Sequence, residues 1–280
     1  MAIELGKINT LVVKRYVDFG LYLSAQDDDI EVLMPRRYTS RDMRVGDLVD
    51  VFVYNDSEDR MVATTEKPYA MVGEFALLRV NSVSGVGAFL DWGLMKDLLV
   101  PFREQKMRMI KGRSYIVYVY VDDASDRIVA SAKIDKFLDN KIPSFKPYEE
   151  VDILVVQRTD LGYKVIVNNL FSGIIYHNQI FQEINIGDKM KAHIKALRPD
   201  GKIDVIIGSS EKNRVHELAD SILSFMSRNH GEMRITDASS PDEIKAIFQC
   251  SKKDFKKALG YLFKQHLIDL TDKEFVKLVK

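Results

Sequence analysis

The chain of 280 residues is 46% apolar and 29% charged, which is ordinary for a globular protein and long enough for two to four domains. Its 41 basic and 41 acidic side chains leave no net charge, which excludes a bulk electrostatic field as the main basis of nucleic-acid binding. No apolar run comes near about 18 residues, and the N-terminus lacks a basic start before a long apolar core, so we expect neither a membrane span nor a signal peptide.

An internal repeat organises the first three quarters of the chain. A glycine opens an apolar strand pattern three times, with spacings of 67 and 75 residues, at Gly20, Gly87 and Gly162. A second glycine marker recurs with nearly the same spacing at Gly46, Gly112 and Gly187, and a basic residue does so at Arg60, Arg127 and Lys202. Because three independent markers keep one register, we interpret this region as three tandem β-units.

The repeat sets the expected domain boundaries. The three units are predicted at residues 1–67, 68–136 and 149–210, with a short stiff linker at 137–148, where two prolines interrupt any periodic pattern. The acidic run Asp27-Asp28-Asp29 falls in a hairpin of the first unit. A solvated turn is favoured there over a metal site, because no other ligand cluster accompanies it.

The remaining residues, 211–280, change from a period of two to the helical period of 3.6. An amphipathic helix is predicted over 212–229, and Ser240-Pro241-Asp242-Glu243 has the serine, proline and glutamate of a helix start with a capping box. A third helix is expected from the cap Ser251 to Gln265, with short strands at 233–235 and 268–270. This order of helices and wing strands resembles a winged helix-turn-helix domain.

The second unit carries the most informative motifs. In chain order they are Gly73, Val86-Gly87-Ala88-Phe89, Asp97-Leu98-Leu99-Val100-Pro101, Lys111–Val117 and Arg127-Ile128-Val129-Ala130-Ser131. The pattern resembles the S1 RNA-binding domain, one of the oligonucleotide-binding (OB) barrels, although Val86 and Pro101 replace an aromatic residue and a histidine of the family. The resemblance implies a mainly β fold of three tandem S1-type OB barrels, followed by a winged helix-turn-helix as the α/β C-terminal domain.

Candidate binding residues follow from the same resemblance. In S1 domains the aromatic residues of the bend and the arginine of the fifth strand face the nucleic acid, which places Phe19, Tyr22, Phe89, Arg60 and Arg127 on that face. Aromatic platforms beside cations are the usual means of holding unpaired bases. Further candidates are Trp92, Tyr176, His177 and, more weakly, Lys202. The alternative for each aromatic side chain is core packing.

The third predicted helix of the C-terminal domain presents a cluster of lysines, namely Lys252, Lys253, Lys256 and Lys257. Lysines so close together can contact phosphates. Reading duplex DNA would need Arg or Asn at base-contacting positions, and the exposed side of this helix carries only Lys, so duplex DNA is disfavoured as a partner. The alternatives are a solvated basic face and a contact with protein.

Motifs for catalysis are missing from the sequence. It contains no phosphate-binding glycine loop, no HExxH or GxSxG pattern and no Cys/His spacing for a metal, so we expect no enzyme activity, no cofactor and no metal. The single cysteine, Cys250, precludes an internal disulfide and lies among apolar neighbours, where a buried thiol is favoured over a reactive one.

Taken whole, the chain resembles the conserved virulence factor B family of bacterial RNA-binding regulators. Within the C-terminal domain the resemblance is carried by Ser240–Ile244 and by Ser251–Gly260. It implies a cytoplasmic, non-catalytic protein that binds single-stranded RNA and affects gene expression, including that of virulence factors. Two alternatives stay open: an adaptor that docks on the ribosome or RNA polymerase, and a DNA-binding regulator that acts through its winged helix.

Overall fold

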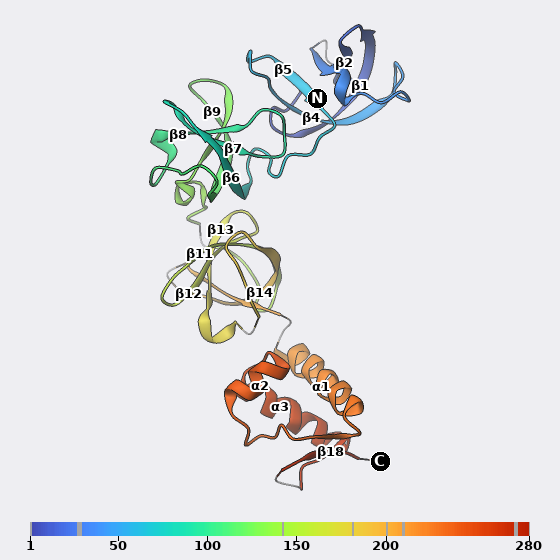
Figure 1. The fold of residues 1–280 in the computed structure, drawn as a ribbon, viewed down its shortest axis with the longest axis vertical. Helices are drawn as coiled ribbons and strands as arrows, with labels where there is room; N and C mark the ends of the chain where they lie inside the picture. Colours follow the sequence, from blue (N-terminus) through green and yellow to red (C-terminus); the bar gives the residue numbers. More distant parts are fainter. Residues whose placement is uncertain are drawn as a thin grey trace. The chain divides into compact units, whose positions relative to one another are not determined.

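The structure is a computed structural model that describes residues 2–26, 30–141, 143–180, 182–199, 201–208, 211–271 and 274–279, with backbone only for 211–214. The acidic run Asp27–Asp29 lies outside the described residues. The chain divides into two compact units, Met1–Leu138 and Asp139–Lys280, which are described separately. Most of it is β-structure, and the helices lie near the C-terminus (Figure 1).

The first five strands form a closed barrel in the order β1-β2-β3-β5-β4. They are β1 (Ile8–Val17), β2 (Gly20–Ser24), β3 (Glu31–Pro35), β4 (Leu48–Asn55) and β5 (Met61–Thr64), with a short 3-10 turn, η1 (Arg36–Tyr38), after β3. Neighbours are antiparallel except β3 and β5, whose parallel pairing closes the barrel. Alternate side chains, such as Leu11 and Val13 of β1, point into the barrel and are fully buried.

The second group of strands repeats this order but leaves the sheet open. Its strands are β6 (Phe75–Val83), β7 (Gly87–Asp91), β8 (Leu98–Pro101), β9 (Ser114–Asp122) and β10 (Arg127–Ser131), with 3-10 turns η2 (Phe102–Glu104) and η3 (Ile134–Phe137). The order is β10-β9-β6-β7-β8, so β8 and β10 are edge strands where their counterparts β3 and β5 pair. We expected a closed barrel here as well; in the structure β8 and β10 lie side by side but are not hydrogen-bonded to each other.

The outer face of the first barrel packs into the hydrophobic core of the second sheet, while the barrel interior forms a core of its own. In β4 the consecutive residues Val51 to Tyr54 are all buried, so both faces of this strand are covered. Phe52 faces the second sheet, where its ring lies edge-on to Trp92 with centroids 5.6 Å apart. Gly6 permits a close approach beside them, because a Cβ there would lie 2.2 Å from Cγ2 of Val72. The two sheets of Met1–Leu138 therefore pack as one body.

The second unit begins with another closed barrel in the order β11-β12-β13-β15-β14. Its strands are β11 (Glu150–Arg158), β12 (Gly162–Val167), β13 (Phe171–Tyr176), β14 (Lys189–Leu197) and β15 (Ile203–Ile207), with the 3-10 turn η4 (His177–Gln179). The repeat inferred from glycines holds in detail, because Gly20, Gly87 and Gly162 are the first residues of β2, β7 and β12. Phe137, the first residue of the expected linker, stacks its ring on Tyr118 with centroids 4.1 Å apart.

The C-terminal domain has the helices and wing expected of a winged helix. Its elements are α1 (Glu211–Arg228), β16 (Glu232–Met233), α2 (Pro241–Phe248), α3 (Lys252–Lys264), β17 (Ile268–Asp269) and β18 (Val276–Leu278), with sheet order β16-β18-β17. The capping box at α2 is present: Glu243 N–H donates to Ser240 Oγ (3.2 Å) and Ser240 N–H donates to Glu243 Oε2 (2.8 Å). Within the described residues, no helix is long and apolar enough to cross a membrane.

Candidate nucleic-acid interface

The first barrel presents two aromatic rings beside two arginines. Phe19, in the turn between β1 and β2, is 57% exposed, and its ring meets that of Tyr22 edge-on with centroids 6.5 Å apart. The guanidinium of Arg15 lies 4.1 Å from the centroid of the Tyr22 ring. Tyr22 is half-buried beneath this guanidinium, so the exposed ring of Phe19 is the surface on which a flat base can stack, with a cation beside it.

Carboxylates of the same barrel hold both arginines. Arg15 Nη2 donates to Glu31 Oε2 (2.6 Å) from β3, and Arg60 is paired with Asp56 (2.7 Å) and Glu58 (2.9 Å) in the β4–β5 hairpin. Partial burial acts to raise the pKa of Asp56, but hydrogen bonds from the Arg60 side chain and backbone outweigh it and the pKa is lowered. Both cations therefore carry partners that a phosphate would have to replace.

Arg15 was missed from the sequence. It stands opposite Tyr22 in the β1–β2 pairing, one step beyond a bulge that shifts the register. The bulge explains the omission, because simple alternation along β1 does not show which face Arg15 joins. Its counterparts opposite Phe89 and Lys164 are Ser82 and Gln157, so this arginine is a feature of the first barrel.

Residues of β7, β8 and β10 in the second sheet line a groove of about 580 Å³. Phe89 of β7, Leu99 of β8 and Val129 of β10 supply apolar walls, and Arg127 stands at the start of β10. Phe89 and Arg127 thus line the same groove. Ser57 and Asp59 of the first barrel also line the groove, which the sequence did not predict.

Two contacts hold the hairpin of the first barrel at this groove. Asp59 forms an ion pair with Arg127, and Lys96 Nζ donates to the carbonyl oxygens of Asn55 (3.0 Å) and Asp56 (2.6 Å). Partial burial lowers the pKa of Lys96. Nothing near Lys96 in the sequence indicates that its ammonium group would bind backbone carbonyls of another domain.

Trp92 is corrected from a candidate stacking residue to a core residue. Its side chain is 2% exposed, packs against Phe52 and donates from Nε1 to the carbonyl oxygen of Lys96 (2.8 Å). A base cannot reach a ring that is covered in this way. The tryptophan instead joins the first barrel to the second sheet.

The third barrel has fewer exposed rings on the corresponding face. Leu161 and Lys164 occupy the positions of Phe19 and Tyr22, as read from the strand registers. Tyr176 is half-buried, with the Arg198 guanidinium 5.5 Å from its ring centroid. His177 is exposed, and its Nε2 lies 3.0 Å from the carbonyl oxygen of Thr159.

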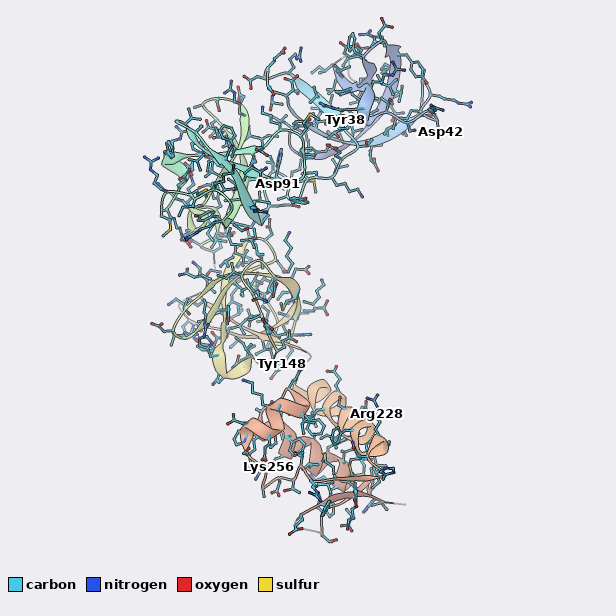
Figure 2. All side chains as sticks on the ribbon, in the orientation of Figure 1. Tyr38, Asp42, Asp91, Tyr148, Arg228 and Lys256 are labelled. Carbon is cyan, nitrogen blue, oxygen red and sulfur yellow. The ribbon has the colours of Figure 1, made fainter. Side chains whose placement is uncertain are left out.

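The lysines of α3 do not form one uniform face. Lys252 Nζ donates to the carbonyl oxygens of Ala238 (3.3 Å) and Ser239 (2.8 Å), which ties the start of α3 to the preceding loop. Lys256, labelled in Figure 2, is exposed and lies 3.5 Å from Asp237. Lys253 is exposed, and Lys257 is half-buried.

Comparison with known proteins matches both ends of the chain. The family model of the S1 domain matches residues 5–66, and that of the CvfB-like winged helix domain matches residues 220–277. The chain therefore contains an S1 domain and a CvfB-like winged helix domain. These are families of nucleic-acid-binding domains.

Similar proteins extend the match beyond these domains. The uncharacterized protein YitL of Bacillus subtilis is 27% identical over 92% of this chain and 89% of its own length. Conserved virulence factor B of Staphylococcus aureus is 24% identical over 82% of this chain and 79% of its own. A solved multidomain protein with nucleic acid binding domains from Streptococcus pneumoniae is 24% identical, covers 98% of both chains and has a TM-score of 0.41. The family models and the two named relatives confirm the resemblance to the conserved virulence factor B family over most of the chain.

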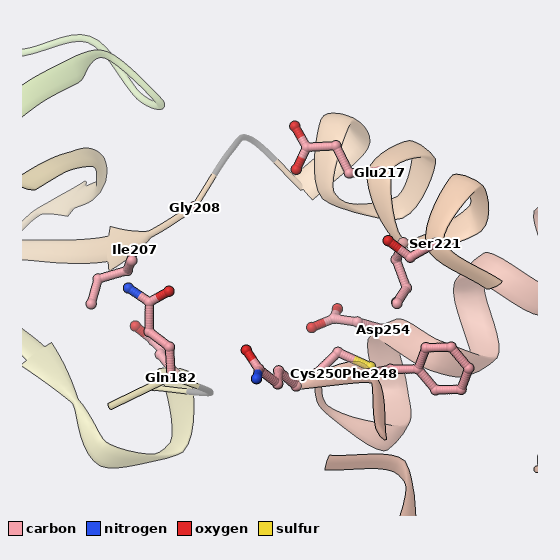
Figure 3. Close-up of a pocket in the computed structure, with 11 residues that line it drawn as sticks. Gln182, Ile207, Gly208, Glu217, Ser221, Phe248, Cys250 and Asp254 are labelled. Atoms are coloured by element: carbon pink, nitrogen blue, oxygen red, sulfur yellow. The ribbon is translucent and has the colours of Figure 1, made fainter. Parts of the chain in front are cut away.

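Phe19, Tyr22 and Arg60 all fall within residues 5–66, the segment that the S1 family model matches. Metal chemistry has no visible support: the part of the chain that the structure describes holds no group of three His, Cys, Asp or Glu side chains arranged for a metal ion. Burial, and secondarily the charge of Asp254, raises the pKa of the Cys250 thiol to about 12. Cys250 also lines a cavity of about 240 Å³ together with Gln182 and Ile207 (Figure 3).

Proposed function

We propose that this protein is a non-catalytic RNA-binding regulator that holds single-stranded RNA on its S1-type sheets. The observation that carries the proposal is the exposed ring of Phe19 beside Tyr22, with the Arg15 guanidinium over the second ring. Unpaired bases stack on such rings regardless of their sequence, while the arginines bind the phosphate backbone. In duplex nucleic acid the base faces are already covered by neighbouring bases, so a duplex gains nothing from these rings.

The neutral charge of the whole chain is compatible with this role. Affinity would come from stacking and from a few local cations, with little contribution from bulk attraction. Several weak sites on one chain raise the overall affinity, because binding at one increases the effective concentration of RNA at the next. Phe89 and Arg127 supply a second site, and Lys253 and Lys256 of the winged helix supply phosphate contacts.

The proposed setting is the cytoplasm, with an effect on gene expression after transcription. The name of the Staphylococcus aureus relatives, conserved virulence factor B, is the support for a regulatory role. The protein would act by occupying unpaired RNA segments. No reaction on the RNA is part of the proposal.

Replacing Phe19 by alanine is expected to weaken binding of a labelled single-stranded RNA of about 16 nucleotides, the upper site size of one such barrel. The loss of one stacked base costs about 1–3 kcal/mol, or about 5- to 150-fold in Kd. Fluorescence anisotropy at low salt measures it. Phe19→Leu is the matched control, because it keeps an apolar side chain and removes the flat ring.

The stacking mechanism predicts that Phe19→Leu is nearly as weak a binder as Phe19→Ala, whereas simple hydrophobic contact predicts that leucine restores affinity. A duplex RNA of the same length is expected to bind less tightly to the unaltered protein. Failure of the unaltered protein to bind single-stranded RNA at low salt would refute the function, and equal binding by Phe19→Ala would remove its main support.

A further inference from the structure

The groove of the second sheet is built from two domains. Its apolar side comes from Phe89, Leu99 and Val129, whereas Ser57 and Asp59 reach it from the β4–β5 hairpin of the first barrel. Lys96 holds that hairpin by donating to the carbonyl oxygens of Asn55 and Asp56. The groove therefore exists in this form only while the hairpin is in place.

The chemistry of the groove fits one nucleotide. Its volume of about 580 Å³ lies within the range of small-ligand sites. Phe89 lies at the apolar side, and the charged lining consists of two cations, Arg127 and Lys96, and two carboxylates, Asp59 and Asp97. An apolar platform next to a guanidinium is the combination that an unpaired base and its phosphate require.

A carboxylate occupies the place where the phosphate would bind. Asp59 pairs with Arg127, and the Asp59 backbone adopts a left-handed conformation with φ of 62°. Both partners are well exposed, with 54% of the Arg127 side chain and 41% of the Asp59 side chain accessible. Exposed ion pairs are weak, so a second anion can displace this carboxylate.

We propose that Asp59 of the first barrel competes with an RNA phosphate for Arg127, and so lowers the affinity of the nucleotide site in the groove between the first barrel and the second sheet. The inference rests on the proposed function. The base lies against Phe89, and a phosphate oxygen replaces the carboxylate of Asp59 on the guanidinium. The first barrel thereby sets the affinity of a site whose base platform belongs to the next sheet.

The test is the variant Asp59→Asn, which removes the charge and keeps a residue that tolerates left-handed backbone. We expect Kd for the single-stranded RNA to fall about two- to fivefold at low salt, the range set by the strength of an exposed ion pair. Asp42→Asn is the matched control, since Asp42 is exposed (Figure 2) and its substitution changes the net charge by the same amount. Thermal unfolding establishes that each variant is folded.

A double-mutant cycle decides whether Arg127 carries the effect. Arg127→Ala should weaken binding, and Asp59→Asn should give no gain when Arg127 is absent. The proposal is overturned if Asp59→Asn tightens binding no more than Asp42→Asn does, if it weakens binding, or if its gain persists in the Arg127→Ala background. These results would leave the proposed function standing, whereas a complete lack of RNA binding by the unaltered protein overturns both.

Discussion

Replacing Trp92 by alanine is expected to lower the free energy of unfolding of the Met1–Leu138 unit by about 3–5 kcal/mol. The ring is buried to 2% exposure, packs on Phe52 of the first barrel and donates a hydrogen bond to the carbonyl oxygen of Lys96. Its removal leaves a cavity in the core that the two sheets share and an unpaired carbonyl group beside it. Few side chains of this unit contribute to two sheets at once.

Hydrogen exchange during urea titration measures this effect, since it reports β1–β10 separately from the rest of the chain. Phe19→Ala is the control, because it truncates an exposed ring of the same unit and should change stability by less than about 0.5 kcal/mol. Trp92→Phe should lie between them, as it retains most of the packing and loses the hydrogen bond. Equal stability of Trp92→Ala and Phe19→Ala would contradict the shared core.

RNA binding should respond to Trp92→Ala as well. The carbonyl oxygen that the indole binds belongs to Lys96, whose ammonium group holds the β4–β5 hairpin against the second sheet. A displaced Lys96 would release the hairpin and with it Asp59. Stability and affinity are thus expected to change together here, whereas Phe19→Ala should change affinity alone.

The sequence contained a signal for this shared core that the pattern of repeats obscured. Val51-Phe52-Val53-Tyr54 is a continuous apolar run, and such a run is typical of a strand covered on both faces. Trp92 was placed among the candidate platforms because it follows the bend that carries Phe89. A side chain near a bend can turn to either face, and the partner that decides it, Phe52, is remote in the sequence.

Local features were predicted well because local chemistry determines them. The capping box of Ser240 and Glu243 and the glycines that open β2, β7 and β12 need only their own neighbours. Ion pairs depend on the assembled fold, and their partners were not predicted. The Asp59 partner of Arg127 comes from the preceding domain, and Lys252, one of four lysines expected to contact phosphate, is tied to backbone carbonyls instead.

The glycine at the start of β7 gives the second large effect. We expect Gly87→Ala to destabilise the second sheet by about 3 kcal/mol, at the upper end of the cost of overpacking. A Cβ at this position would lie 2.3 Å from the carbonyl oxygen of Val100 and 3.0 Å from Cα of Pro101. Both obstacles are backbone atoms of the paired strand β8, so the strain cannot be relieved by turning a side chain.

Gly85 provides the control within the same hairpin, because an added Cβ there meets no atom within 4 Å. Gly85→Ala should be close to neutral or slightly stabilising, since alanine restricts the unfolded chain more than glycine does. Hydrogen exchange in β7 and β8 measures both variants. Similar stability of the two would show that the repeat glycines are not required for the crossing of these strands.

The same substitution connects the fold to the site. Phe89 lies two residues after Gly87 and pairs with Leu99, so a displaced β7 carries the base platform away from Arg127. RNA affinity of Gly87→Ala should therefore fall toward that of Phe89→Ala, while Gly85→Ala should bind as the unaltered protein does. A Cβ added at Gly20 or Gly162 would likewise lie close to a backbone carbonyl oxygen, at 2.1 and 1.9 Å, so all three bends depend on the same close crossing of two strands. If Gly87→Ala is destabilised yet binds RNA normally, the close crossing of β7 and β8 is not required for the binding site.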